Sequence, residues 1–332
     1  MIEERDLKIR RGSVDDSYAV FEVFERSLAD LLRRQGSETP ASADDAAALA
    51  KMWEERRSLY SHLARTADQY WIADKDGQAV GYARSILRDG AQNLTELFIL
   101  PGVQSTGLGR ALIEQAFPKV HARYRSLISS PDIRAHSLYM KSGVYPRFPL
   151  YYLWRKPEHV NYQTDLEIIP LSDSQDVVDR LAEVDIEILD YRRDVDHLWL
   201  QSERPGYLYN RGGRPVGYGY FGSRTGPVAL LDAADFPAAL AHAESSAAGK
   251  HNNFGLEVPA VNHVVLDYLL SRGFHMESFV ATLMTDQPFG SFERYIVTSP
   301  PPCIVIIQVL SLTLWPGTDK FMPTARELQI SL

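Results

Sequence analysis

The segment that decides the fold reads Leu94-Thr95-Glu96-Leu97-Phe98-Ile99-Leu100-Pro101-Gly102-Val103-Gln104-Ser105-Thr106-Gly107-Leu108-Gly109-Arg110-Ala111-Leu112. An apolar strand ends at its proline, and a Gln-x-x-Gly-x-Gly turn then opens directly into a helix. Glycine lets the backbone approach a ligand closely, and the first amides of a helix have no partner within the helix. Because these amides lie at the positive end of the helix dipole, the turn predicts a binding site for an anion such as a pyrophosphate.

Two other kinds of glycine loop do not fit the residues around this turn. A Walker loop ends in Gly-Lys-Ser/Thr, whereas Gly109 is followed by Arg110 and Ala111. A dinucleotide fingerprint has the pattern Gly-x-Gly-x-x-Gly after the first strand of a βαβ unit, and this segment lacks it. A glycine turn with a purely structural role is the alternative interpretation.

Three sequence patterns occur twice in the chain, in the same order. The pairs are residues 7–10 and 166–169, residues 76–83 and 212–219, and residues 138–144 and 268–274. The first pattern is an alternating strand, the second a hairpin turn between apolar runs, and the third a helix end closed by glycine. Together they predict a duplicated domain; two unrelated α/β domains with similar turns are the alternative.

The length of 332 residues is enough for two hydrophobic cores. We expect a first domain over residues 1–160, a second over residues 161–299, and a tail over residues 300–332, whose role is left open. For the first domain we expect a strand over 7–11, helices over 15–34 and 44–66, a hairpin over 70–74 and 79–88, a strand over 93–100, a helix over 107–117, a strand over 125–129, a helix over 133–142 and a strand over 148–155.

These residues resemble the GNAT superfamily of N-acetyltransferases, whose donor-binding signature is Arg/Gln-x-x-Gly-x-Gly/Ala. Residues 104–109 match that signature in full. A second family landmark, Ala-x-x-Leu-Tyr-x-x-x-Gly-Phe, occurs at residues 135–144, with Val144 in place of the usual aromatic residue. Asp132 stands where the family often has asparagine. The resemblance covers residues 5–156.

The resemblance implies an α/β fold with two acyl-CoA N-acyltransferase domains, each a mixed, mostly antiparallel sheet flanked by helices. It also implies that acetyl-CoA binds in a V-shaped opening between the fourth and fifth strands, with no metal. The backbone of Phe98 and Ile99 would pair with the pantetheine arm, and the loop amides would hold the pyrophosphate. The donor-binding residues implied are Phe98, Ile99, Leu100, Gln104, Ser105, Thr106, Gly107, Leu108, Gly109 and Arg110.

The family transfers its acetyl group by direct attack, and two side chains are candidates for the proton transfers. Tyr139 would donate a hydrogen bond or a proton to the leaving thiolate; the alternative is a tyrosine that only packs. Glu96 would act as the base; the alternative is a carboxylate on a solvated strand face. A backbone amide near Ile99 or Leu100 would stabilise the oxyanion. Tyr82, Arg84 and Trp53 are expected, by analogy with the family, to line the acceptor pocket.

The second copy has lost the donor-binding features. Its glycine loop should fall near residues 236–241, where no Gly-x-Gly occurs and Pro237 removes an amide. Leu269 aligns with the position of Tyr139, and Asn262 with Asp132. We therefore expect a degenerate domain that packs on the first, completes the acceptor pocket or mediates assembly. Its charged segment 190–197 either steers a cationic amine or is a solvated helix end.

Composition limits the class of ligand. Hydrophobic residues make up 45% of the chain and charged residues 23%, which is typical of a folded, water-soluble protein. The net charge of −8 argues against general binding of nucleic acid. The acidic average hides a basic segment, because residues 101–160 contain nine Lys or Arg and three Asp or Glu. A small phosphorylated ligand would suit that segment.

The remaining sequence features favour a cytoplasmic protein. Cys303, the single cysteine, has no partner for an intramolecular disulfide, and the charged N-terminus lacks an apolar signal core. The longest apolar run, residues 304–315, is too short to cross a bilayer as a helix. No spacing of histidine, cysteine and acidic residues indicates a metal site.

The sequence thus predicts an N-acetyltransferase that moves an acetyl group from acetyl-CoA to a primary amine, with an active N-terminal domain. A non-catalytic sensor of acyl-CoA or of a metabolite, built on the same duplicated fold, is the alternative. The partner is expected to be a small-molecule amine, with no nucleic acid and no membrane, and a homodimer is possible. A small amine, an amino acid, an aminoglycoside and a peptide N-terminus all stay open as the acceptor.

Overall fold

The structure, a computed structural model, describes residues 7–297 apart from residues 38, 40–44, 105–106, 120–121, 173 and 223. The expected tail over residues 300–332 therefore lies outside the described residues. The first half of the chain contains β1 (Leu7–Arg11), a 3₁₀ turn η2 (Val14–Asp16), α1 (Ser17–Arg34), α2 (Ala46–Arg65), β2 (Ala67–Lys75), β3 (Gln78–Arg88), β4 (Ala91–Ile99), α3 (Leu108–Ala116), β5 (Tyr124–Ser129), α4 (Ile133–Lys141) and β6 (Tyr145–Arg155).

The second half repeats this order of strands and helices. It contains β7 (Glu167–Pro170), α5 (Gln175–Leu189), α6 (Asp194–Glu203), β8 (Gly206–Arg211), β9 (Arg214–Tyr220), β10 (Val228–Leu230), η4 (Ala233–Asp235), α7 (Phe236–Ala247), β11 (Phe254–Pro259), α8 (His263–Ser271) and β12 (His275–Thr285), followed by η5 (Phe292–Arg294) and β13 (Tyr295–Ile296). From β1 to β6 and from β7 to β12 the order is strand, two helices, three strands, helix, strand, helix, strand. The repeat confirms the tandem arrangement, whereas a division at residue 160 stays a prediction.

The repeated turns have the geometry that their residues predict. Asp76 and Gly77, between β2 and β3, have φ values of 53° and 80°, and Gly212 and Gly213, between β8 and β9, have 57° and 76°. Two successive positive φ values suit the twist of a tight hairpin, and glycine adopts them without a steric penalty. The same local chemistry therefore builds both hairpins.

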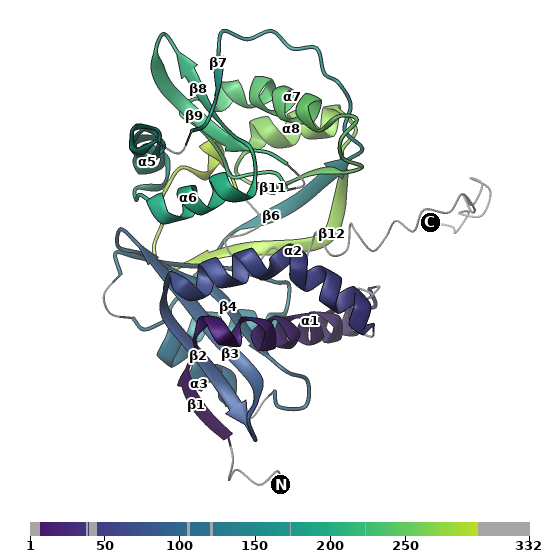
Figure 1. The fold of residues 1–332 in the computed structure, drawn as a ribbon, viewed down its shortest axis with the longest axis vertical. Helices are drawn as coiled ribbons and strands as arrows, with labels where there is room; N and C mark the ends of the chain where they lie inside the picture. The colour runs from purple at the N-terminus through teal and green to yellow at the C-terminus, as the bar shows by residue number, and fades with distance from the viewer. Residues whose placement is uncertain are drawn as a thin grey trace, which may run out of the picture.

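The last strand of each half pairs with a strand of the other half: β12 with β5, and β6 with β11 (Figure 1). The large sheet has the order β1-β2-β3-β4-β5-β12-β6-β11, and the small sheet β13-β10-β9-β8-β7. Residues 282–285 of β12 pair antiparallel with residues 126–129 of β5, while β6 pairs with both β12 and β11. The two halves are thus joined through backbone hydrogen bonds as well as through side chains.

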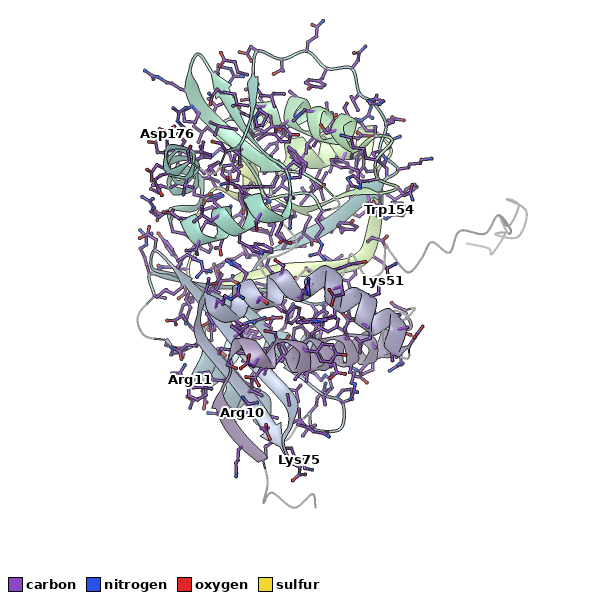
Figure 2. All side chains as sticks on the ribbon, viewed as in Figure 1. Arg10, Arg11, Lys51, Lys75, Trp154 and Asp176 are labelled. Carbon is purple, nitrogen blue, oxygen red and sulfur yellow. The ribbon has the colours of Figure 1, made fainter. Side chains whose placement is uncertain are left out.

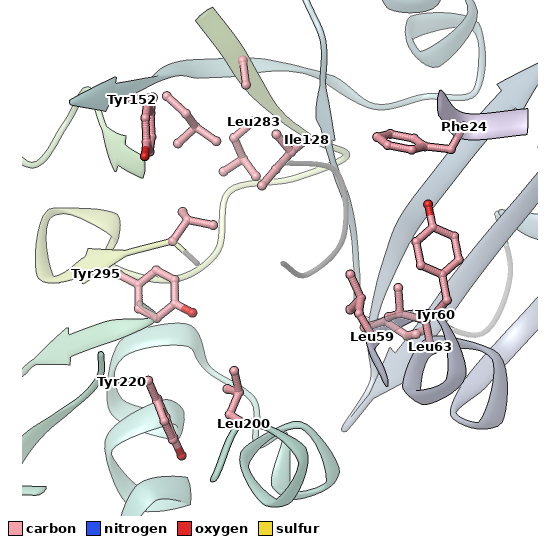
Figure 3. Packing of buried hydrophobic residues seen from close by; sticks show 14 of the residues in the cluster. Phe24, Leu59, Tyr60, Leu63, Ile128, Tyr152, Leu200, Tyr220, Leu283 and Tyr295 are labelled. Carbon is pink, nitrogen blue, oxygen red and sulfur yellow. The ribbon is translucent and has the colours of Figure 1, made fainter. Parts of the chain in front are cut away.

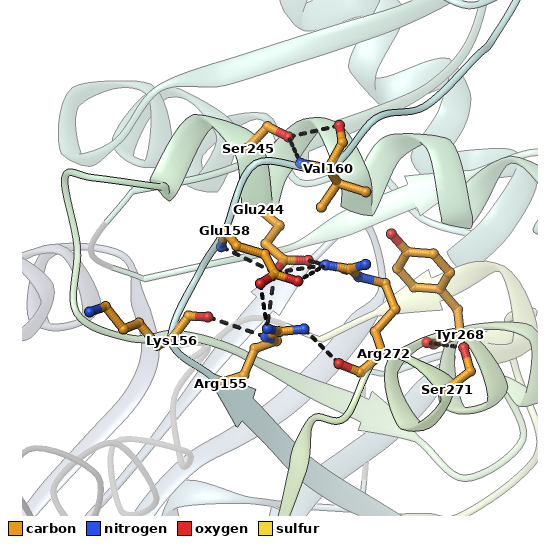
Figure 4. Close-up of polar contacts among 9 residues, drawn as sticks. All are labelled: Arg155, Lys156, Glu158, Val160, Glu244, Ser245, Tyr268, Ser271 and Arg272. Carbon is orange, nitrogen blue, oxygen red and sulfur yellow. Dashed lines mark hydrogen bonds and ion pairs between the residues drawn. The ribbon is translucent and has the colours of Figure 1, made fainter.

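Polar contacts hold the end of β6 against the second half (Figure 4). Arg155 donates to the carbonyl oxygen of Arg272 at 2.6 Å, and Arg272 forms an ion pair with the buried Glu244 at 3.2 Å. The chain after β6 continues along α7, where the amide of Val160 donates to Ser245 Oγ at 2.9 Å. These contacts fix the course of the connection between the halves.

Three buried clusters form the core. One lies under α3 and α4 in the first half, and one under α7 and α8 in the second. The third is shared, because α1 and α2 of the first half and α5 and α6 of the second half contribute to it together. Figure 3 shows its members from both halves, among them Phe24, Tyr60, Ile128, Leu200, Tyr220, Leu283 and Tyr295. Charged side chains such as Lys51 and Asp176 lie on the exposed faces of the helices (Figure 2).

The charged segment 190–197 has two parts. Arg192 and Asp194 form an ion pair of 2.7 Å, as the interpretation of a solvated helix end expects, and the steering of an amine stays a prediction. Asp196 is bound by Arg88 of β3 through two hydrogen bonds of 2.9 Å and by His62 of α2 at 2.8 Å, and the His62 ring stacks on Trp199 with centroids 4.9 Å apart. Burial opposes its charge, but these partners hold the pKa of Asp196 well below its usual range. Asp196 therefore links α6 of the second half to α2 and β3 of the first half, and its carboxylate is not simply solvated.

Candidate active site

The fourth and fifth strands of the first half diverge. β4 and β5 run parallel, and their pairing covers residues 91–94 and 124–127 alone. Past Leu94 the strands separate, and a pocket of about 350 Å³ lies in the opening. Its lining comprises Ser27, Leu28, Leu31, Arg34, Leu97, Phe98, Ile99, Gln104, Gly107, Gly109, Arg110, Ile128, Ser130, Asp132, Arg134, Ala135, Leu138 and Tyr139. The pocket therefore includes most of the residues that the sequence predicts for donor binding.

The glycine turn forms one wall of this pocket. Gly107 has a φ of 87°, and its carbonyl oxygen accepts from the amides of Arg110 and Ala111, both at 3.1 Å, so α3 begins directly after it. A Cβ on Gly109 would lie 3.2 Å from Ile99 Cδ1 and 3.4 Å from Leu138 Cδ2, which shows how closely the helix approaches β4 and α4. The predicted Ser105 and Thr106 lie outside the described residues.

The exposed backbone of β4 follows from its pairing with β3. The amide of Leu100 donates to Val80 at 2.9 Å, and Phe98 lies opposite Tyr82. Because hydrogen-bonded and non-bonded pairs alternate along an antiparallel ladder, the backbone groups of Leu97 and Ile99 face the opening. The carbonyl oxygen of Ile99 accepts there from Ser27 Oγ at 3.1 Å and from Gln104 Nε2 at 3.0 Å.

The pairing of β3 with β4 shows which of the predicted backbone groups are free to face the pocket and which are bound to β3. Of the two candidate oxyanion donors, the Leu100 amide is bound to β3, whereas the Ile99 amide faces the pocket. Phe98 contributes its ring to the lining while its backbone belongs to the β3 ladder. Leu97 is a backbone candidate that the sequence interpretation missed. The strand register would have identified it, but the register is not visible in one segment alone.

Tyr139 lines the pocket from α4 and is 8% exposed. Its helix is fixed at both ends: Asp132 Oδ1 accepts from the amide of Arg134 at 2.9 Å, and the chain turns at Gly143, where φ is 87°. Tyr139 thus lines the pocket from α4, together with Leu97, Phe98 and Ile99 from the end of β4.

Arginines flank the same pocket. Asp132 forms ion pairs with Arg134 at 3.0 Å and with Arg34 of α1 at 3.3 Å. Burial works against the charge of Asp132, but the hydrogen bonds from Arg134 and the positive charges of both arginines lower its pKa to about 2. A neighbouring cavity of about 500 Å³ shares Arg110 and Leu138 with the first and is also lined by Lys119 and Lys141. The basic segment of the sequence thus surrounds the opening.

Glu96 does not line this pocket. It is 3% exposed, on the α1–α2 face of β4, so the alternative of a solvated strand carboxylate is wrong. Arg84 binds it through Nη2 and through Nε at 2.8 Å, and the Tyr82 hydroxyl donates to it at 2.9 Å. Burial and the charge of Glu96 raise the pKa of Tyr82 well above its usual range, so Tyr82 stays a proton donor. The role of Glu96 as a base stays a prediction.

The second half has no comparable opening among its described strands. β13 pairs with β10 at residues 228–229, and Val297 bridges Glu257 of β11, so this short strand lies where the first half has its pocket. Asn262 caps α8 through a 3.2 Å bond to the amide of Val265, as Asp132 caps α4. Leu269 is fully buried.

Two absences hold for the described part of the chain. Its helices are each too short or too polar to span a bilayer. Over the same residues, no three His, Cys, Asp or Glu side chains are grouped so that they could hold a metal ion.

Residues 37–145 match a family model described as an acetyltransferase (GNAT) domain. The chain therefore contains a GNAT acetyltransferase domain, and its opening between β4 and β5 lies within the matched residues. No curated protein matches the sequence. The domain match supports acyl transfer as the general activity.

Solved structures resemble most of the chain. A protein from Pyrococcus horikoshii, proposed to be an acetyltransferase, has a TM-score of 0.66 at 13% identity, over 89% of this chain and 95% of its own. A GCN5-related N-acetyltransferase from Sphaerobacter thermophilus has a TM-score of 0.55 at 13% identity, over 88% and 99%. A tandem GNAT protein from the clavulanic acid biosynthesis pathway has a TM-score of 0.50 at 14% identity, over 85% and 99%. At these identities the likeness is one of fold, and the fold is that of a tandem GNAT protein.

Proposed function

We propose that this protein transfers an acetyl group from acetyl-CoA to a primary amine, with the active site in its first half. The observation that carries this proposal is the divergence of β4 and β5 over a pocket bordered by the glycine-started helix α3 and by Tyr139. A thioester arm fits such an opening, and a pyrophosphate fits the amides at the start of α3.

The amine nitrogen attacks the thioester carbonyl, a C–N bond forms, and the C–S bond breaks. The Ile99 amide faces the opening and would donate to the developing oxyanion. Tyr139 would give a proton or a hydrogen bond to the departing thiolate sulfur. The nitrogen loses a proton, which Glu96 would accept directly or through water.

A second candidate function is a sensor that binds acyl-CoA without turnover. The observation that favours it is the environment of Glu96, whose two carboxylate oxygens already accept from Tyr82 and Arg84. To act as a base, Glu96 must give up the hydrogen bond from Tyr82 or from Arg84 and accept one from the amine or from a water molecule instead. If the protein is such a sensor, acetyl-CoA binds and no acetyl group is transferred.

Thiol release from acetyl-CoA, measured across a panel of amines, separates the two functions. The enzyme releases coenzyme A in an amine-dependent way, and the sensor binds it with no such release. Gly107→Asp places a carboxylate beside the start of α3 and should abolish coenzyme binding in calorimetry. Gly213→Asp is the matched control, since Gly213 also has a positive φ (76°) and open space around it. Normal coenzyme binding by Gly107→Asp would contradict the assignment of the loop.

A further inference from the structure

Another polar cavity lies between the two halves of the molecule, and its walls come from α2 and α6. The two helices lie side by side where the halves meet (Figure 1). We call the space between them, of about 500 Å³, the α2–α6 cavity. It is lined by Arg57, Ser58, Ser61, His62, Arg65, Thr66, Trp199 and Ser202. These lining residues include two arginines and no Asp or Glu, in a chain whose net charge is −8.

The α2–α6 cavity is separate from the donor pocket, because the two lie toward opposite ends of β3. Gly81 of β3 pairs with Ile99, which lines the donor pocket. Arg88, at the other end of β3, donates to Thr66 Oγ1 of the α2–α6 cavity at 2.8 Å. A strand rises about 3.3 Å per residue, so residues 81 and 88 are roughly 20 Å apart. A small molecule in the α2–α6 cavity therefore does not touch a thioester in the donor pocket.

One wall of the α2–α6 cavity is held in place by hydrogen bonds and ring stacking. Trp199 Nε1 donates to Ser58 Oγ at 3.1 Å, and the same hydroxyl donates to Glu203 Oε1 at 2.7 Å. The Trp199 ring also stacks on His62, which is bound to Asp196. Because this wall is ordered before a ligand arrives, little free energy is spent on ordering it when the ligand binds.

The donors that remain available lie along one face of α2. Arg57, Ser61 and Arg65 follow one another at intervals of four residues, which places them in a row on the helix. The side chains of Ser61 and Arg65 form no hydrogen bond or ion pair with any residue that the structure describes. Arg57 pairs with Glu54 at 3.2 Å, where both side chains are more than half exposed, so this pair contributes little.

The arrangement of these donors suits a phosphate group. The helix rises about 1.5 Å per residue, so the Cα atoms of Arg57 and Arg65 are roughly 12 Å apart, with Ser61 midway between them. The two long side chains can therefore converge on one group beside the Ser61 hydroxyl. A guanidinium binds phosphate through two parallel N–H groups, and a phosphate monoester offers three acceptor oxygens where a carboxylate offers two.

We propose that the α2–α6 cavity binds a small molecule that carries a phosphate group, and that Arg57, Ser61 and Arg65 hold the phosphate. This second site is independent of the proposed acetyl transfer. Because Trp199 and Ser202 of the second half also line the cavity, a bound molecule contacts both halves and stabilises their packing.

The test is calorimetry with inorganic phosphate and glycerol 3-phosphate as probes, at constant ionic strength. Glycerol is the neutral match of the second probe, and succinate is the carboxylate probe. Coenzyme A is present in excess, because the start of α3 is another place where a phosphate can bind. The wild-type chain should bind both phosphate probes, bind succinate more weakly, and give no signal with glycerol.

Arg65→Gln should weaken the binding of glycerol 3-phosphate by about tenfold or more, because it removes a charge-assisted contact. Ser61→Ala keeps every charge and should weaken binding by about threefold, which a general electrostatic effect does not explain. Arg214→Gln is the matched control, since Arg214 is an exposed arginine at the β8–β9 turn, outside the α2–α6 cavity. It should bind the probe as the wild-type chain does.

Four results would overturn the inference. They are no binding of either phosphate probe by the wild-type chain, tighter binding of succinate than of phosphate, unchanged affinity in Arg65→Gln, and equal losses in Arg65→Gln and Arg214→Gln. The heat of binding is measured without any acetyl transfer. A chain that releases no thiol from acetyl-CoA can therefore still confirm this site, and a failed site leaves the proposed function untouched.

Discussion

At the scale of single residues, two buried glutamates have opposite surroundings. Glu96 on β4 accepts hydrogen bonds from Arg84 and Tyr82. Glu257 on β11 is 2% exposed, and neither of its carboxyl oxygens has a hydrogen-bond partner in the described structure. Burial raises the pKa of Glu257 to about 8. The first half thus surrounds its glutamate with donors, whereas burial without a hydrogen-bond partner favours the neutral form of the glutamate in the second half.

The neutral state of Glu257 predicts a pH-dependent stability. An unfolded glutamate loses its proton near pH 4.5, whereas the native one keeps it up to about pH 8, so stability falls as the pH rises between these values. Glu257→Gln resembles the protonated form and should raise stability at pH 9 by on the order of a few kcal/mol, with little change at pH 4. Thermal melts across this range, with the exposed Glu183→Gln as control, measure the effect. An unchanged profile would show that Glu257 is charged in the native protein.

Tyr139 offers a second test at this scale. Phenylalanine keeps the packing of the ring but lacks the hydroxyl, so Tyr139→Phe should lower kcat by about 10²- to 10⁴-fold without weakening coenzyme binding. Stopped-flow thiol release and calorimetry measure the two quantities. If Tyr139 only packs, kcat stays at the wild-type value.

At the scale of elements, α6 is held against α2 and β3 through Asp196. Its partners Arg88 and His62 lie more than a hundred residues earlier in the chain. Asp194, two residues before it, pairs instead with Arg192 at 2.7 Å, and these two side chains are more exposed than those of Arg88 and Asp196. One helix therefore carries an ion pair that is largely buried and another that is more exposed, and the two are expected to differ in their contribution to stability.

Asp196→Asn should leave Arg88 with an uncompensated charge and destabilise the protein by about 3 kcal/mol. Asp194→Asn on the same helix should cost less than about 1 kcal/mol. Denaturant unfolding of both variants measures the difference. Because the pKa of Asp196 is lowered in the native protein, its contribution is present near neutral pH and is lost in acid. If both substitutions lower the free energy of unfolding equally, the contacts of Asp196 do not stabilise the packing of α6 against α2 and β3.

At the scale of the whole molecule, the exchange of β6 and β12 makes the halves depend on each other. Without the second half, the edge of β5 loses its pairing of residues 126–129 with β12, and β6 loses both of its neighbours, β12 and β11. Unpaired strand edges with apolar faces promote association with other chains.

Residues 1–160 alone should therefore fail to form a stable monomer. We expect them to aggregate or self-associate in size-exclusion chromatography with light scattering. Co-expression with residues 161–332 should restore a soluble pair of fragments that unfolds cooperatively. A monomeric, cooperatively folded first fragment would show that the exchanged strand is dispensable, and would support 1–160 as an independent domain.

The parts of the site that depend on local chemistry could be predicted from the sequence. The glycine turn, the start of α3, the cap at Asp132 and the helix that carries Tyr139 each depend on residues within a few positions of one another. The partners of Glu96 could not be predicted in this way. Tyr82 and Arg84 were expected to line the acceptor pocket, but the register of β3 against β4 places both on the glutamate.

The sequence by itself determined the local elements, their repeated order and the chemistry of the donor loop, because these follow from backbone conformation and from periodic patterns of apolar residues. The tertiary structure alone decided which strands exchange, where Asp196 pairs and which side chains bind Glu96. Those features depend on contacts between residues that are far apart in the chain, and no local pattern records such a contact.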